Sequence, residues 1–171
     1  MKVFKKIDEL KLAPAEAKLQ KPHRLASTKY NNSVKGIIVD KKNNYLLQLR
    51  DNKKNIYFPN FWGVFGGRVE KAETYRKAIK REIKEETNLI VRVSRMILSV
   101  NYKMIGLKKK PNIVYYECGI SEKRKIILTE GQKYKFFSFK QIKKLNIIPM
   151  DFAAIKIHYL KIIKKNVKNQ V

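Results

Sequence analysis

Residues 66–89 read GGRVEKAETYRKAIKREIKEETNL, and this stretch combines a glycine turn with a helical pattern that follows it. The apolar residues Ala78, Ile79 and Ile83 recur at helical spacing. Thr74 favours the start of a helix, and Asn88 tolerates the left-handed conformation at which many helices end. We therefore predict a helix over about 74–87 with one face directed into the protein.

Acidic residues concentrate in this stretch. Five of the 14 acidic residues of the chain lie between positions 70 and 86. At about 100° per residue, Glu82, Glu85 and Glu86 share one face of the predicted helix. Clustered carboxylate oxygens suit a hard divalent cation such as Mg²⁺. The alternative is a solvated helix face in which nearby lysine and arginine side chains neutralise the acids.

The length and composition bound the remaining possibilities. A chain of 171 residues with 44% hydrophobic residues is expected to form one globular domain. No apolar run approaches the roughly 20 residues of a membrane span, and the first residues do not resemble a signal peptide. The single Cys118 excludes an internal disulfide. We expect a cytoplasmic protein.

The net charge of +26 is compatible with binding to nucleic acid. However, lysine far outnumbers arginine, and isoleucine and asparagine are abundant too, a combination that AT-rich codons would produce. We favour that compositional origin over a dedicated nucleic-acid surface. In either case the positive field attracts small anionic molecules.

The 66–89 stretch resembles the signature of the Nudix hydrolases, which cleave nucleoside diphosphates linked to another moiety. In the family pattern, five residues separate a glycine from a glutamate, and seven residues separate that glutamate from an arginine–glutamate pair. Two adjacent glutamates follow shortly afterwards. Gly67, Glu73, Arg81 and the glutamates already named stand at those positions. Asn88 replaces the final glycine of the pattern and can adopt the same left-handed conformation.

This resemblance implies an α/β fold, an α/β/α sandwich around a mixed β-sheet. Apolar runs at 34–39, 45–50, 61–67, 90–100 and 112–120 supply candidate strands, and 136–139 resembles the tail of the fold. The domain would span 34–171 and include a basic helix over 151–167. Residues 1–33 form an unassigned extension, with a possible helix around 13–19.

The resemblance also implies a cofactor, Mg²⁺ with Mn²⁺ as a substitute, and assigns roles in the site. Water would attack one phosphorus in line while the other phosphate leaves. The implied metal ligands are the Gly66 carbonyl, Glu82, Glu85, Glu86 and Glu130. Glu82 is the first candidate for the general base and Glu85 the second, while some relatives use a distal residue that would match Glu130. Gly67, Glu73 and Arg81 would support the loop.

The implied substrate is a small anionic nucleotide. Arg50 could bind a phosphate, and Tyr57, Phe58 and Trp62 could stack on a base. The alternative, which is more common for aromatic residues at such positions, is that these three belong to the core. Many relatives are homodimers, which makes a homodimer an expectation here. Two other functions stay open: removal of 5′ pyrophosphate from RNA, and a non-enzymatic RNA-binding module that reuses the fold.

Overall fold

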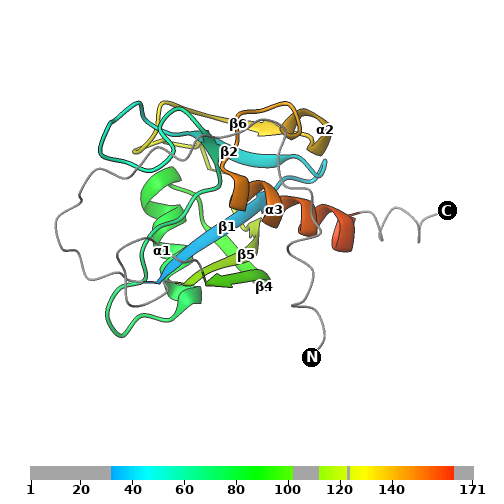
Figure 1. The fold of residues 1–171 in the computed structure, drawn as a ribbon. Coiled ribbons are helices and arrows are strands. Elements are labelled where there is room, and N and C mark those ends of the chain that lie inside the picture. The colour runs from blue at the N-terminus through cyan, green and yellow to red at the C-terminus, as the bar shows by residue number, and fades with distance from the viewer. Residues whose placement is uncertain (1–31, 102–111, 123, 164–171) are drawn as a thin grey trace.

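The computed structural model describes residues 32–101, 112–122 and 124–163, which form a mixed sheet with helices on both faces (Figure 1). The strands are β1 (Ser33–Val39), β2 (Tyr45–Leu49), β3 (Trp62–Gly63), β4 (Val91–Asn101), β5 (Asn112–Ile120) and β6 (Lys133–Phe137). The helices are α1 (Tyr75–Thr87), α2 (Phe139–Ile142) and α3 (Pro149–His158), and a π-helical turn, η1 (Tyr159–Ile163), follows α3.

The sheet is mixed because β1 runs parallel to β5, whereas its other strand pairs are antiparallel. The strand order is β3-β2-β1-β5-β4, and β6 pairs with β2. Strand β1 meets β5 along its whole length but meets β2 only where Val39 faces Tyr45. Strand β1 therefore lies at the centre of the sheet.

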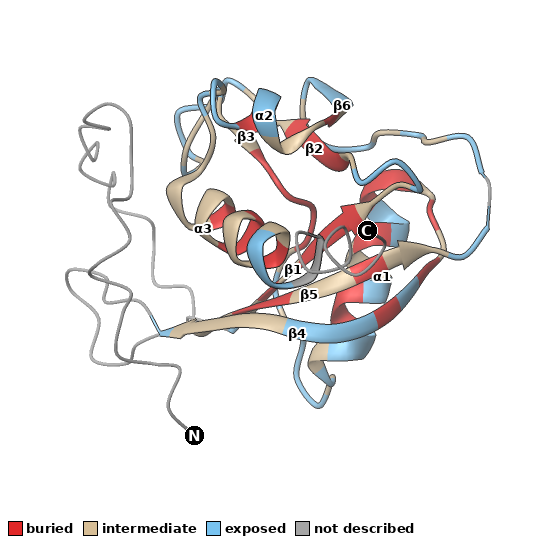
Figure 2. Ribbon diagram, turned by 90° about the vertical axis from the view of Figure 1, so that its right-hand side faces the viewer, coloured by how far each residue is buried: buried red, intermediate tan, exposed pale blue. Residues whose placement is uncertain are grey.

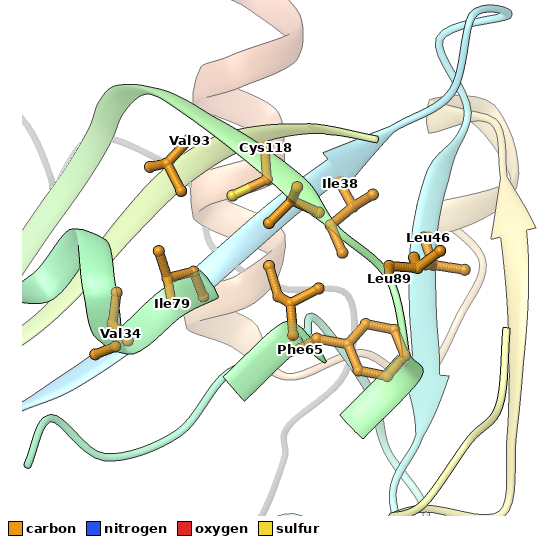
Figure 3. Close-up of a cluster of buried hydrophobic side chains, with 11 residues drawn as sticks. Val34, Ile38, Leu46, Phe65, Ile79, Leu89, Val93 and Cys118 are labelled. Atoms are coloured by element: carbon orange, nitrogen blue, oxygen red, sulfur yellow. The ribbon is translucent and has the colours of Figure 1, made fainter. Parts of the chain in front are cut away.

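Two hydrophobic clusters cover the two faces of the sheet. Ile79 and Ile83 of α1 pack with Phe65 and Ile38 on one face (Figure 3). On the other face, Ile155 and its neighbours from α3 pack over a second cluster that includes strands β1, β2 and β5. Helices α1 and α3 are each buried on the side that faces the sheet (Figure 2). The α/β sandwich expected from the sequence is confirmed.

The predicted helix over 74–87 is confirmed at both ends. The Thr74 side chain accepts a hydrogen bond from the Lys77 amide at 3.3 Å, which fixes the start of α1. Asn88 is left-handed, with φ of 61°, and its amide donates to the Lys84 carbonyl at 2.8 Å. Local residue chemistry therefore determines where this helix begins and ends.

The C-terminal helix differs from the prediction in its bounds. It begins at Pro149, two residues before the predicted start, because proline suits the first turn of a helix. The α-helical part ends at His158 and continues as η1, and the remainder of the predicted helix lies outside the described residues. The possible helix around 13–19 also lies outside them. No helix of the described ranges is long and apolar enough to cross a membrane.

The glycine loop that precedes α1 pairs with the central strand. The Val34 amide donates to the Gly67 carbonyl, and the Gly36 amide donates to the Phe65 carbonyl, both at 2.9 Å. Gly66 lies between these two bonds with φ of 129°, and a Cβ there would collide with the Val34 carbonyl. The loop is thereby held against β1, with the acidic face of α1 next to it.

Candidate active site

Arg81 organises the acidic face of α1. Its guanidinium makes a two-point contact with Glu73, with Nε to Oε1 at 3.1 Å and Nη2 to Oε2 at 2.9 Å. Its Nη1 donates to Glu82 at 2.9 Å and to Glu85 at 3.1 Å, and Nη2 also reaches the Arg68 carbonyl. The hydrogen bonds from Arg81 lower the pKa of Glu73. One guanidinium thus joins three carboxylates to the loop.

Glu86 is the buried member of the acidic group. Only 7% of its surface is exposed, and its Oε2 accepts a hydrogen bond from the Gly66 amide at 2.9 Å. Burial raises the pKa of Glu86 to about 7, against the opposing effects of Lys35 and the Gly66 amide. The charges of Glu130 and Glu82 raise it further. The Glu86 carboxylate is therefore less fully ionised at neutral pH than an exposed glutamate would be.

Glu82 lies between the helix and the glycine loop. A Cβ added at Gly67 would lie 2.6 Å from the Glu82 Cδ, so the carboxylate fills the space that this glycine leaves open. Burial raises the pKa of Glu82, while the Arg81 guanidinium opposes that shift. Glu85, by contrast, has a side chain that is 59% exposed. Of the two candidates for the general base, Glu82 therefore has the more enclosed carboxylate.

Glu130 reaches this region because its segment is fixed to the end of α1. The Thr129 amide donates to the Glu86 carbonyl at 3.1 Å, and the Thr129 hydroxyl donates to the Glu85 carbonyl at 2.8 Å. These bonds satisfy carbonyls that the end of a helix leaves open. Glu130 itself is exposed, and its charge contributes to the raised pKa of Glu86.

The four predicted substrate contacts lie in or near the connection between β2 and β3. The Arg50 Nε donates to the Tyr57 carbonyl at 2.9 Å. Phe58 is left-handed, with φ of 54°, and its ring meets Phe61 edge-on. Trp62 packs edge-on against Phe137 at 4.7 Å and belongs to the margin of the second cluster. The packing of Trp62 fits the core alternative for this residue.

The acids fit a divalent cation in their chemistry. Carboxylate oxygens and a main-chain carbonyl at Gly66 are the hard ligands that Mg²⁺ prefers. Over the ranges that the structure describes, however, no three His, Cys, Asp or Glu side chains are arranged to hold one ion together. Arg81 bridges Glu82 and Glu85, while Glu86 turns to the Gly66 amide. Arg81 occupies only one carboxylate oxygen of each of the two glutamates, Oε1 of Glu82 and Oε2 of Glu85.

Two charged residues near the site were not singled out from the sequence. Lys35 of β1 donates to the Gly66 carbonyl at 3.0 Å. Asp151 of α3 is buried, and it accepts hydrogen bonds from the Val64 amide at 2.9 Å and the Tyr115 hydroxyl at 2.8 Å. A sequence signal existed for each: Lys35 interrupts an apolar strand, and Asp151 is the single acidic residue after Glu130.

Comparison with known proteins gives the same family by sequence. A family model described as the NUDIX domain matches residues 29–156. The chain is 30% identical over 118 residues to a protein of Buchnera aphidicola named 8-oxo-dGTP diphosphatase, an alignment that covers 69% of this chain and 85% of that protein.

Solved structures show the same fold. The MutT protein of Methanosarcina mazei superposes with a TM-score of 0.61 at 19% identity, over 82% of this chain and 99% of that one. An Ap4A hydrolase of C. elegans gives a TM-score of 0.63 at 17% identity, over 78% and 98% of the two chains. At these identities the likeness concerns the fold alone.

Proposed function

The chain belongs to the Nudix family, and from that premise we propose that it is a metal-dependent hydrolase of nucleoside diphosphate derivatives. The observation that carries this proposal is the buried Glu86 carboxylate, which lies on the same helix as Glu82 and Glu85 and is bonded to the glycine loop. Burial of an ionisable carboxylate costs free energy, and a bound cation would offset that cost. A cation-binding role explains why Glu82 and Glu86 both meet the glycine loop while Glu85 lies beside them on α1.

The proposed metal ligands are the Gly66 carbonyl and the carboxylates of Glu82, Glu85 and Glu86, with Glu130 as a further ligand or base. A bound Mg²⁺ or Mn²⁺ would supply charge neutralisation of the phosphate oxygens and a lower pKa for the attacking water. Glu82 is the first candidate to accept the proton of that water, because its carboxylate is enclosed and its pKa is raised by burial. Arg81 and Glu73 hold the loop in place.

The proposed substrate is a small nucleotide with a pyrophosphate bond, which water would cleave by in-line attack at one phosphorus. The name of the Buchnera relative places nucleoside triphosphates first among the compounds to test. Arg50 and Tyr57 lie in the connection that precedes β3 and are the proposed contacts for phosphate and base. Phe58 is proposed to line the same side of the site, together with the part of Trp62 that stays exposed beside its core contact with Phe137.

The test is a panel of nucleoside triphosphates, dinucleotides and nucleotide sugars, measured by phosphate release with Mg²⁺ or Mn²⁺. Hydrolysis of at least one compound is expected, and Glu82→Gln and Glu86→Gln should each lower it by roughly two to four orders of magnitude. Glu122→Gln is the matched control, because Glu122 pairs with Arg124 at the surface. Absence of hydrolysis across the panel with both metals would refute the proposal.

A second candidate function is removal of 5′ pyrophosphate from RNA. It is favoured by one observation: beyond Glu130, the segment that forms β6, α2 and α3 exposes lysines such as Lys133, Lys135 and Lys140, while its single acid, Asp151, is buried. Such a surface suits an anionic polymer. Competition between triphosphorylated RNA and free nucleotides for the same enzyme decides between the two candidates.

A further inference from the structure

Lys35 is the one charged residue of β1, and it points its ammonium group at the glycine loop. Its Nζ donates to the Gly66 carbonyl at 3.0 Å and to the Val64 carbonyl at 3.4 Å. The two backbones are close as well, since a Cβ at Gly66 would lie 3.0 Å from the Lys35 Cα. The ammonium thus lies on the carbonyl that the proposed function assigns to the metal.

The same ammonium compensates two buried acids on different helices. Among the influences that keep Glu86 of α1 and Asp151 of α3 ionised, the charge of Lys35 is the largest, although burial outweighs it for both groups. The pKa of Glu82 is raised by burial, and the charge of Lys35 opposes that rise less strongly than Arg81 does. Lys35 is therefore a cation in direct contact with the proposed metal site, and its two hydrogen bonds hold it there.

We propose that Lys35 is an internal counter-cation of the acidic site, which weakens binding of a free divalent ion and couples that binding to the nucleotide. This inference rests on the proposed function. Two cations that share one carbonyl and one group of carboxylates repel each other, so the lysine disfavours a free ion. A diphosphate brings negative charge that both cations can contact, and the flexible stem of lysine lets its ammonium leave the carbonyl.

Coupling of this kind has a thermodynamic signature. A nucleotide that stabilises both cations should raise the affinity for the ion, and the ion should raise the affinity for the nucleotide by the same factor. A lysine that served only as a counter-charge for the buried Asp151 would affect folding and leave the affinity for the ion unchanged. Measurements of ion binding without catalysis therefore separate the two roles.

The experiment measures binding of Mn²⁺ by the electron paramagnetic resonance signal of the free ion, with and without a non-hydrolysable α,β-methylene nucleoside diphosphate. Lys35→Met removes the charge, and Lys35→Gln removes it but keeps a hydrogen-bond donor. Lys84→Met is the matched control, because Lys84 is an exposed lysine of α1 between the same glutamates. Thermal unfolding in chelator establishes that each variant is folded.

We expect Lys35→Met or Lys35→Gln to bind Mn²⁺ alone about tenfold more tightly than Lys84→Met does. The nucleotide should raise the Mn²⁺ affinity of the wild type about tenfold and that of the Lys35 variants by much less. Equal Mn²⁺ affinities in the Lys35 and Lys84 variants would overturn this inference and leave the proposed function intact. Failure of the wild type to bind Mn²⁺, even with the nucleotide, would overturn both.

Discussion

Glu86 and Gly66 are joined by a hydrogen bond of 2.9 Å from the glycine amide to the buried carboxylate, across 20 residues of sequence. This bond ties the last turns of α1 to the loop that lies along β1. It also keeps the carboxylate buried, because the carboxylate cannot turn to solvent without leaving the amide unpaired. The geometry of the site and the stability of the protein are therefore linked at Glu86.

Glu86→Gln should raise the free energy of unfolding in chelator and weaken metal binding. Burial raises the pKa of Glu86 to about 7, so the stability that this group contributes is present below about pH 4.5 and is lost as the pH rises through about 7. Glutamine keeps an acceptor for the Gly66 amide without the charge. In chelator at pH 8, urea unfolding should show a gain of about 1–3 kcal/mol, with Mn²⁺ affinity reduced more than about tenfold. A loss of stability would contradict this prediction.

Arg81→Lys should destabilise the protein by about 1–3 kcal/mol, because a lysine cannot reproduce the two-point contact with Glu73 and still reach Glu82. Arg124→Lys is the matched control, since Arg124 also pairs with one carboxylate, Glu122, but at an exposed position. The control should change stability by less than about 0.5 kcal/mol. Chemical denaturation measures the stability of both variants. Equal losses would show that the Arg81 network does not stabilise the protein more than a single exposed ion pair does.

Gly67→Ala should displace the Glu82 carboxylate, because the added methyl group would lie 2.7 Å from Oε1. A misplaced carboxylate is expected to lower hydrolysis about 100-fold, with a much smaller change in the melting temperature. Gly119→Ala is the control, since a Cβ at that glycine meets nothing within 4 Å. If Gly67→Ala were as active as Gly119→Ala, the position of Glu82 over this glycine would have no role.

Asn88→Ala should lower the free energy of unfolding by about 1–2 kcal/mol, because the residue has φ of 61° and the alanine side chain is strained in the left-handed conformation. Asn88→Gly should keep the stability of the wild type, since glycine adopts this conformation freely. Urea midpoints of the two variants give the comparison. Identical midpoints would mean that the end of α1 does not depend on the conformational preference of this residue.

His158 should make the protein sensitive to mild acid. Its ring is buried, with Nδ1 3.1 Å from the Tyr45 hydroxyl and Nε2 3.8 Å from Glu117. Burial, followed by the charge of Arg95, lowers the pKa of His158 to about 4. Between its ordinary pKa of about 6.5 and pH 4, the unfolded chain binds a proton on this ring that the folded protein does not, so stability falls as the pH falls.

The measurement compares the wild type with His158→Gln by urea unfolding at pH 7 and pH 4.5. The wild type should lose up to about 3 kcal/mol more than the variant over this range. The comparison removes the opposite contribution of Glu86, whose raised pKa stabilises the protein as the pH falls through the same range. The same pH dependence in both proteins would show that His158 does not titrate in this way.

Much of the site could be predicted from local sequence because its central element is a helix. The ends of α1 follow from Thr74 and Asn88, and the helical repeat alone places Glu82, Glu85 and Glu86 on one side. The family resemblance implies that Arg81 and Glu73 support the loop, and in the structure the two side chains pair with each other. The sharing of the same guanidinium with Glu82 and Glu85 depends on side-chain positions that no repeat specifies.

The family, the acidic helix and the glycine turn all follow from the sequence, because each depends on residues that are near one another in the chain. Folding is what brings Lys35 to Gly66, buries Glu86 and turns Asp151 toward Val64 and Tyr115. These contacts join residues 20 to 87 positions apart. They arise from the pairing of β1 with the glycine loop and the packing of a helix on each face of the sheet, which no local pattern encodes.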